Sequence, residues 1–205
     1  MLGAVSALPQ SFQVGVKAGV PLTDFLNAVQ QPLNSFTTNT KRFVIGPMVQ
    51  VGLPAGFAIE VDALYRRMNY QSQLTLVDVL TKASTTGNAW EFPVLLKYHF
   101  PLPVARPYLA AGLAWDTLAG LRQTISTTIL PNRTSSVSAS NPAELRTSTS
   151  MGAVVGAGLD VKLLRLHVSP EIRYTRWGSQ HFRDVVNGLL HSNSNQAEFL
   201  VGFTF

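Results

Sequence analysis

Apolar residues occupy every second position in eight segments of this chain, each about ten residues long. In the last segment, NQAEFLVGFTF, one parity carries Phe199, Val201, Phe203 and Phe205. The other segments lie near residues 12–20, 43–51, 57–65, 90–100, 109–115, 153–161 and 166–174. Side chains of a β-strand point alternately to its two faces, so the pattern predicts eight strands with one apolar face each.

The connections between these segments differ in length. Those at 53–56, 101–106 and 163–165 are short, whereas those at 21–40, 74–88, 118–146 and 178–194 are long and rich in Ser, Thr, Asn and Gln. Tight turns at one end and long loops at the other are typical of barrels that cross the bacterial outer membrane, and a tilted strand of about ten residues spans their apolar band of roughly 25 Å. We therefore expect an all-β fold: an eight-stranded antiparallel up-and-down transmembrane barrel with short periplasmic turns and long, mobile extracellular loops.

Composition narrows the alternatives. Charged residues make up 13% of the 205 residues, about half the usual share in soluble domains. No stretch reaches the roughly 18 consecutive apolar residues of a membrane-spanning helix. The chain has no cysteine, which excludes disulfides and thiolate metal sites. The net charge is +5, but no basic run exceeds a pair, which argues against nucleic-acid binding.

We expect one domain, the barrel at 12–205. Residues 1–11 are either a flexible N-terminus or the remnant of a signal peptide, because Val5 and Ala7 fit a cleavage site of small residues.

The parity opposite the apolar one carries glycine, alanine and most of the charged residues of the strands. An eight-stranded barrel has a narrow interior that suits small side chains, and a base on the lipid face near the midplane costs about 2–4 kcal/mol. We therefore place this parity in the lumen. Its seven acids and six bases predict a network of paired charges and not an open channel: Lys17, Arg42, Glu60, Asp62, Arg66, Glu91, Lys97, Asp116, Asp160, Lys162, Glu171, Arg173 and Glu198.

Aromatic residues of the apolar parity gather toward the strand ends. The turn side has Phe12, Phe57, Tyr98, Phe100, Phe203 and Phe205, and the loop side has Phe43, Tyr65, Trp90, Phe92, Trp115 and Tyr174. Two such girdles are expected where rings lie at both membrane interfaces. As candidate girdle and insertion-signal residues we take Phe199, Phe203, Phe205, Tyr98, Trp90 and Trp115. The alternative is that these rings form the core of a soluble sandwich.

Pro47, Pro93 and Pro170 fall inside predicted strands. A closed barrel has no free edge where a missing N–H is harmless. Each proline should therefore mark a bulge or a lost ladder bond.

Segments such as GFAIEVDALYRR, AWEFPVLLKYHF, RPYLAAGLAW, LHVSPEIRYTRW and EFLVGFTF resemble those of small outer-membrane β-barrel proteins, the group of OmpX, the OmpA transmembrane domain and the opacity proteins. The resemblance covers nearly the whole chain. It implies a place in the bacterial outer membrane and insertion by the barrel-assembly machinery, which reads a final alternating strand that ends in Phe, here Phe205. We also expect a monomer without cofactor, with outer-membrane lipids and lipopolysaccharide as candidate partners.

One strand face carries His167, Ser169 and Glu171. An outer-membrane lipid A deacylase combines His-x-Ser with a Glu, but side chains two apart on a strand are about 7 Å apart, too far for a nucleophile to reach its base directly. We expect these residues to pack in the lumen and the protein to be no enzyme. The other histidines stand singly, without the spacing of metal ligands.

The loop side of the chain holds an excess of bases: Lys41, Arg42, Arg66, Arg67, Lys82, Arg122, Arg133, Arg146, Arg173, Arg176 and Arg183. A cationic rim of this kind either contacts lipid phosphates or is simply solvated. The sequence thus predicts a structural or surface-interaction role for the loops. A narrow porin-like channel and a soluble lipid-binding calyx remain as alternatives.

Overall fold

The computed structural model describes residues 11–23, 26–28, 34–38, 43–76, 79–103, 105–129, 133–139, 148–163, 166–179 and 190–205. Almost all of the expected N-terminal segment at 1–11 lies outside this part of the chain, and so does Arg42.

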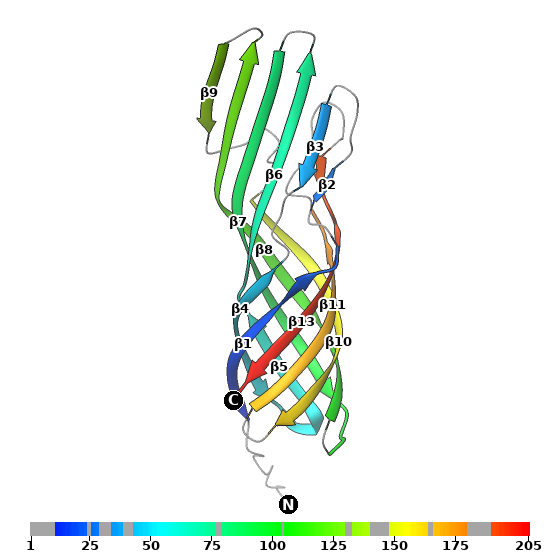
Figure 1. Ribbon diagram of the computed structural model, residues 1–205. Helices are drawn as coiled ribbons and strands as arrows, with labels where there is room; N and C mark the ends of the chain where they lie inside the picture. Colours follow the sequence, from blue (N-terminus) through cyan, green and yellow to red (C-terminus); the bar gives the residue numbers. More distant parts are fainter. Residues whose placement is uncertain are drawn as a thin grey trace, which may run out of the picture.

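Antiparallel strands close into a barrel (Figure 1). In ring order they are β1 (Phe12–Pro21), β4 (Val44–Gly52), β5 and β6 (Phe57–Asp62 and Leu64–Leu76), β7 (Val79–His99), β8 (Ala105–Ile129), β10 (Thr149–Leu163), β11 (Leu166–Trp177) and β13 (Asn195–Thr204). β5 and β6 form one wall strand, interrupted at Ala63. The predicted eight-stranded barrel is confirmed.

The last strand closes the barrel against the first. β13 pairs with β11 on one side and with β1 on the other, where Gly15 faces Thr204 and Gly19 faces Leu200. A Cβ atom added at Gly15 would overlap the carbonyl of Phe203, and one at Gly19 the carbonyl of Phe199. Only glycine permits this close approach of two backbones, so the glycines of FQVGVKAGV allow the seam to close.

Pro47, Pro93 and Pro170 each have a regular partner on one side and an interrupted ladder on the other. Pro47 and Pro93 flank the break at Ala63: pairing stops between Met48↔Asp62 and Ile45↔Tyr65, and between Val61↔Val94 and Leu64↔Glu91. Pro170 lies in a similar gap between Gly158↔Glu171 and Val161↔Val168. The expected loss of ladder bonds is confirmed, and the register is unchanged across each gap.

Three wall strands continue far beyond the barrel. β6, β7 and β8 extend into a sheet that β3 (Asn34–Thr38) and β9 (Arg133–Ala139) flank, and it rises above the barrel mouth in Figure 1. β2 (Leu26–Ala28) and β12 (Leu190–Ser192) form a separate pair. The expectation of loops at 74–88 and 118–146 is therefore wrong for most of these residues, which belong to this extracellular sheet.

A bulge in β8 and a polar outer face explain why the apolar alternation does not continue into this sheet. Thr86 pairs with Arg122, but Asn88 pairs with Ala119, so β8 carries one extra residue, and Gly120 there has φ of 62°. The extra residue shifts the period of two, so that odd-numbered residues of β8 replace even-numbered ones on the inner face. Beyond the bulge the outer face is also polar, which removes the apolar signal.

The apolar parity faces outward along the barrel wall. Leu96, Leu113 and Ile172 expose 50%, 43% and 59% of their surface, whereas Lys17, Glu60 and Arg173 of the opposite parity are fully buried. A soluble calyx requires the reverse arrangement. The distribution of exposed apolar side chains therefore contradicts the calyx alternative.

Candidate functional site

A cluster of six ionisable side chains fills the middle of the lumen. We call it the central cluster: Lys17, Glu60, Asp62, Lys97, Glu171 and Arg173. Three bases face three acids, and all six side chains are at most 1% exposed. Because parity places these residues on the inner faces of β1, β5, β7 and β11, their side chains meet near the barrel axis.

Arg173 joins opposite walls of the barrel. Its guanidinium donates to Glu171 Oε1 at 2.7 Å and to Asp62 Oδ2 at 3.1 Å, and β11 and β5 lie four strands apart in the ring. Lys17 Nζ bridges the same two strands, 2.5 Å from Glu60 Oε1 and 3.2 Å from Glu171 Oε2. These bonds cross the full width of the lumen.

Tyr108 on β8 completes the central cluster, although charge patterning gave no sign of it. Its hydroxyl donates to Glu171 Oε2 at 2.8 Å, and Lys97 Nζ lies 4.2 Å from its ring centroid. The sequence does contain a signal for Tyr108: it lies two residues before Ala110 and therefore shares the luminal face of β8.

A second group, the upper cluster, lies toward the extracellular side. Arg66 reaches Glu91 Oε2 at 2.5 Å and Glu198 Oε1 at 3.3 Å, and it also donates to Gln196. Asp116 is buried directly across the β7–β8 ladder from Glu91. Acids therefore outnumber the base in this layer.

The luminal charges at the periplasmic end are only partly enclosed. Asp160 accepts from Arg106 at 2.8 Å and from His167 Nδ1 at 2.9 Å, and Arg106 keeps 42% of its side chain exposed. Lys162 was predicted to join the luminal network but is exposed. It has the luminal parity, but it is the second-last residue of β10, where solvent enters the barrel mouth.

His167, Ser169 and Glu171 do not assemble into a catalytic group. His167 binds Asp160, Glu171 is held by Arg173, Lys17 and Tyr108, and Ser169 is buried. Among the described residues, no group of three or more His, Cys, Asp or Glu side chains is placed to hold a metal ion. In the same part of the chain, no helix has the length and apolarity needed to span a bilayer.

A family model described as "Outer membrane protein beta-barrel domain" matches residues 1–205. The chain belongs to this family. The protein is thus an integral β-barrel of the bacterial outer membrane.

The solved structures to which the chain is similar are distant in sequence. Outer membrane protein OprG from Pseudomonas aeruginosa is 13% identical, with 94% of this chain and 92% of that chain covered and a TM-score of 0.50. Neisserial surface protein A is 14% identical, with 96% and 98% covered and a TM-score of 0.43. Ail of Yersinia pestis is 6% identical, with 95% and 99% covered and a TM-score of 0.38. A comparison with curated protein sequences gives no match.

Aromatic rings mark two levels on the outside of this outer-membrane barrel. On the turn side the ring centroid of Tyr98 lies 5.0 Å from that of Phe57 and 5.1 Å from that of Phe100. On the loop side Tyr65 and Trp90 lie 5.2 Å apart, and Tyr65 also contacts Phe43. We call these the lower and upper girdles.

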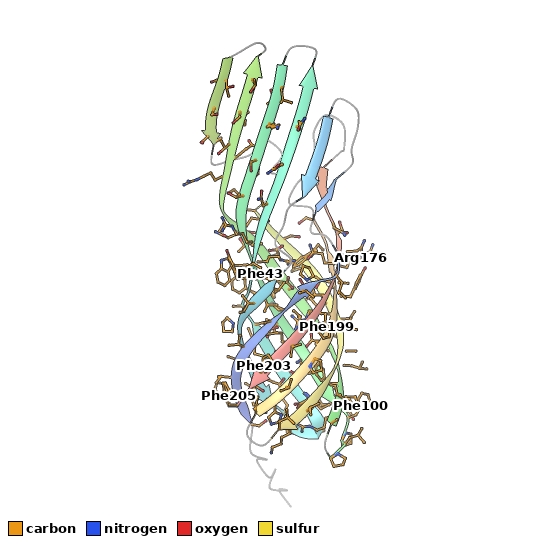
Figure 2. All side chains as sticks on the ribbon, in the orientation of Figure 1. Phe43, Phe100, Arg176, Phe199, Phe203 and Phe205 are labelled. Carbon is orange, nitrogen blue, oxygen red and sulfur yellow. The ribbon has the colours of Figure 1, made fainter. Side chains whose placement is uncertain are left out.

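The remaining candidate rings divide between these levels. Trp115 pairs with Phe92 across the β7–β8 ladder, next to the upper girdle. Figure 2 shows Phe205 low on the barrel, Phe203 somewhat higher, and Phe199 between the two girdles, so Phe199 belongs to neither. Phe205 is 71% exposed, and its N–H donates to the carbonyl of Val14 at 3.1 Å.

Every charged side chain on the outer surface of the described chain is basic. All seven described acidic residues are buried on the luminal parity, whereas Arg67, Lys82, Arg122 and Arg176 are exposed on the extracellular half. Arg66 and Arg173, which the rim prediction also counted, lie in the lumen. Lys41, Arg42, Arg146 and Arg183 lie outside the described residues, as does the side chain of Arg133.

Proposed function

We propose that this outer-membrane barrel is neither a channel nor an enzyme and that it acts at the cell surface through its extracellular sheet. The central cluster carries the proposal. Its ion pairs connect strands on opposite walls. The buried charged groups contact one another in place of water. Moving them apart leaves buried charges unpaired, which costs several kcal/mol per ion.

A narrow channel is the second candidate, because the periplasmic end is hollowed. A pocket of about 390 Å³ lies there, with Gln13, Gln50, His99 and Arg106 in its lining. Ala58 and His99, also in the lining, stand two residues from Glu60 and Lys97 of the central cluster. The pocket therefore leads toward the central cluster, whose ion pairs lie across the path.

Planar-bilayer recording distinguishes these two candidates. We expect the folded, heat-modifiable protein to give no single-channel steps at neutral pH, because paired buried charges leave no continuous water path. A wide porin purified and reconstituted in the same way is the positive control. Regular steps from the folded protein, absent from a mock preparation, would assign it the channel role instead.

The extracellular sheet offers a surface for hydrogen bonding. On its outer face, hydroxyl groups of β8 and β9 pair across the ladder: Thr124 with Ser138 at 3.4 Å, Ser126 with Ser136 at 3.0 Å and Thr128 with Thr134 at 3.2 Å. Ser84, Gln71 and Gln73 continue this face on β7 and β6. Because hydroxyls both donate and accept, an uncharged polar partner such as a neutral glycan suits the face.

Cells that display the protein test this role on an array of immobilised neutral glycans. We expect wild-type cells to be retained on at least one glycan, and Ser126→Glu/Ser136→Glu to reduce retention about tenfold, because two carboxylates replace paired hydroxyls. Val137→Glu is the matched control, since Val137 is 63% exposed on the opposite face of β9. Retention no greater than that of cells without the protein, or an equal loss in the control, would contradict this role.

A further inference from the structure

The bulge in β8 leaves a small pocket on the outside of the barrel, where the extracellular sheet begins. Its volume is about 230 Å³. The lining comes from three adjacent strands: Arg67 on β6, Thr86, Gly87 and Asn88 on β7, and Gly120 and Arg122 on β8.

The pocket lies directly above the upper girdle. Arg67 follows Tyr65 by two residues on β6, and Asn88 precedes Trp90 by two residues on β7. Because side chains alternate along a strand, Arg67 and Asn88 share the outer face with these two rings. Rings of this kind lie at the membrane interface, so the pocket is at the height of the lipid headgroups.

The polar groups in the pocket are hydrogen-bond donors. Both Arg67 and Arg122 are exposed, and within the described part of the chain neither guanidinium forms an ion pair. The carboxamide of Asn88 is oriented by Tyr65, whose hydroxyl donates to Asn88 Oδ1 at 2.8 Å. This bond leaves Asn88 Nδ2 as the donor on the other side of the carboxamide.

Gly120 keeps this donor accessible. A Cβ atom at Gly120 would lie 3.3 Å from Asn88 Nδ2, and the residue has φ of 62°, a conformation that favours glycine. The bulge therefore holds two guanidinium groups and one amide donor around a common space. No acidic side chain of the described chain is available to neutralise them, because all seven are buried in the lumen.

We propose that this pocket binds a phosphate group of a phosphorylated glycolipid in the outer leaflet. Guanidinium groups bind phosphate oxygens through paired, charge-assisted hydrogen bonds. The height of the pocket, level with lipid headgroups and open to the outside of the barrel, selects a membrane lipid over a soluble anion as the source of the phosphate.

Native mass spectrometry of the full chain in detergent micelles tests the site, with diphosphorylated lipid A as the probe and the same lipid without its phosphates as the reference. Arg67→Gln/Arg122→Gln removes both guanidinium groups of the pocket. Lys82→Gln/Arg176→Gln is the matched control, because it removes the same charge from two exposed bases outside the pocket lining. Figure 2 shows Arg176 near the top of the barrel, on the side opposite Phe43. A heat-modifiable gel band confirms that each variant is folded.

We expect the pocket variant to bind diphosphorylated lipid A at least about tenfold more weakly than wild type, since charged hydrogen bonds are lost, and the control variant to bind it within about twofold of wild type. Wild-type protein should also prefer the phosphorylated lipid to its reference. Equal weakening of lipid A binding in both variants would show that the effect comes from general surface charge, and it would contradict the proposed site. Equal binding of the reference lipid would exclude phosphate recognition, and displacement of lipid A by millimolar inorganic phosphate would reassign the pocket to a free anion.

Discussion

Arg173→Met is expected to destabilise the barrel by about 3–5 kcal/mol, because removal of one partner leaves buried charges uncompensated. Arg173 is completely buried and binds Glu60, Asp62 and Glu171. Without it, three carboxylates face only Lys17 and Lys97. Urea-induced unfolding in lipid vesicles, followed by tryptophan fluorescence, measures the change in the free energy of unfolding.

Two further variants make this result specific. Arg176→Met removes the same kind of side chain from the same strand at an exposed position, and we expect a change within about 0.5 kcal/mol. Arg173→Met/Asp62→Leu removes a base together with an acid, so it should recover part of the lost stability. Equal effects of Arg173→Met and Arg176→Met would show that the central cluster does not stabilise the barrel.

Ile172→Arg is expected to reduce the stability of the barrel in a bilayer by about 2–4 kcal/mol, the cost of an arginine on the lipid face near the midplane. Ile172 is 59% exposed, and it pairs with Ala157 on one side and with Phe199 on the other. Figure 2 shows Phe199 between the two girdles, which places Ile172 near the middle of the apolar band. The measurement is the free energy of folding into vesicles of defined thickness.

The matched control for Ile172→Arg is Ser84→Arg. Ser84 lies on the outer face of β7 within the extracellular sheet, above the upper girdle. Water surrounds this part of the sheet, so the new charge should cost less than about 0.5 kcal/mol. If both substitutions cost the same, the girdles do not mark the membrane boundaries.

The alternation of side chains made the wall of the barrel predictable. Parity alone assigns Ile172 to the lipid face and Arg173 to the lumen, and it identifies the segment of β13 as a strand. Pro47, Pro93 and Pro170 were predicted to interrupt the ladder and do so. All of these inferences need only the local period of two residues.

The same rule failed where its period changed. One extra residue at Gly120 reverses the faces of β8, and the hydroxyl-rich outer face beyond it has no apolar signal. The sequence therefore predicted loops where Thr124 and Ser136 belong to paired strands. Lys162 has the luminal parity but is exposed, because parity states which face a side chain takes and not how far the barrel encloses it.

By itself the sequence determined the fold class, the strands of the membrane wall and the face that each side chain takes, because these follow from spacing along one strand. Only the tertiary structure decided that Arg173 meets Asp62 across the lumen and that Arg67 and Arg122 share one pocket. Residues 111 positions apart in the first case, and on strands two apart in the ring in the second, come together through the register and closure of the whole barrel. No local pattern encodes that register, so the luminal ion pairs and the outer basic pocket follow only from the way all the strands pair around the ring.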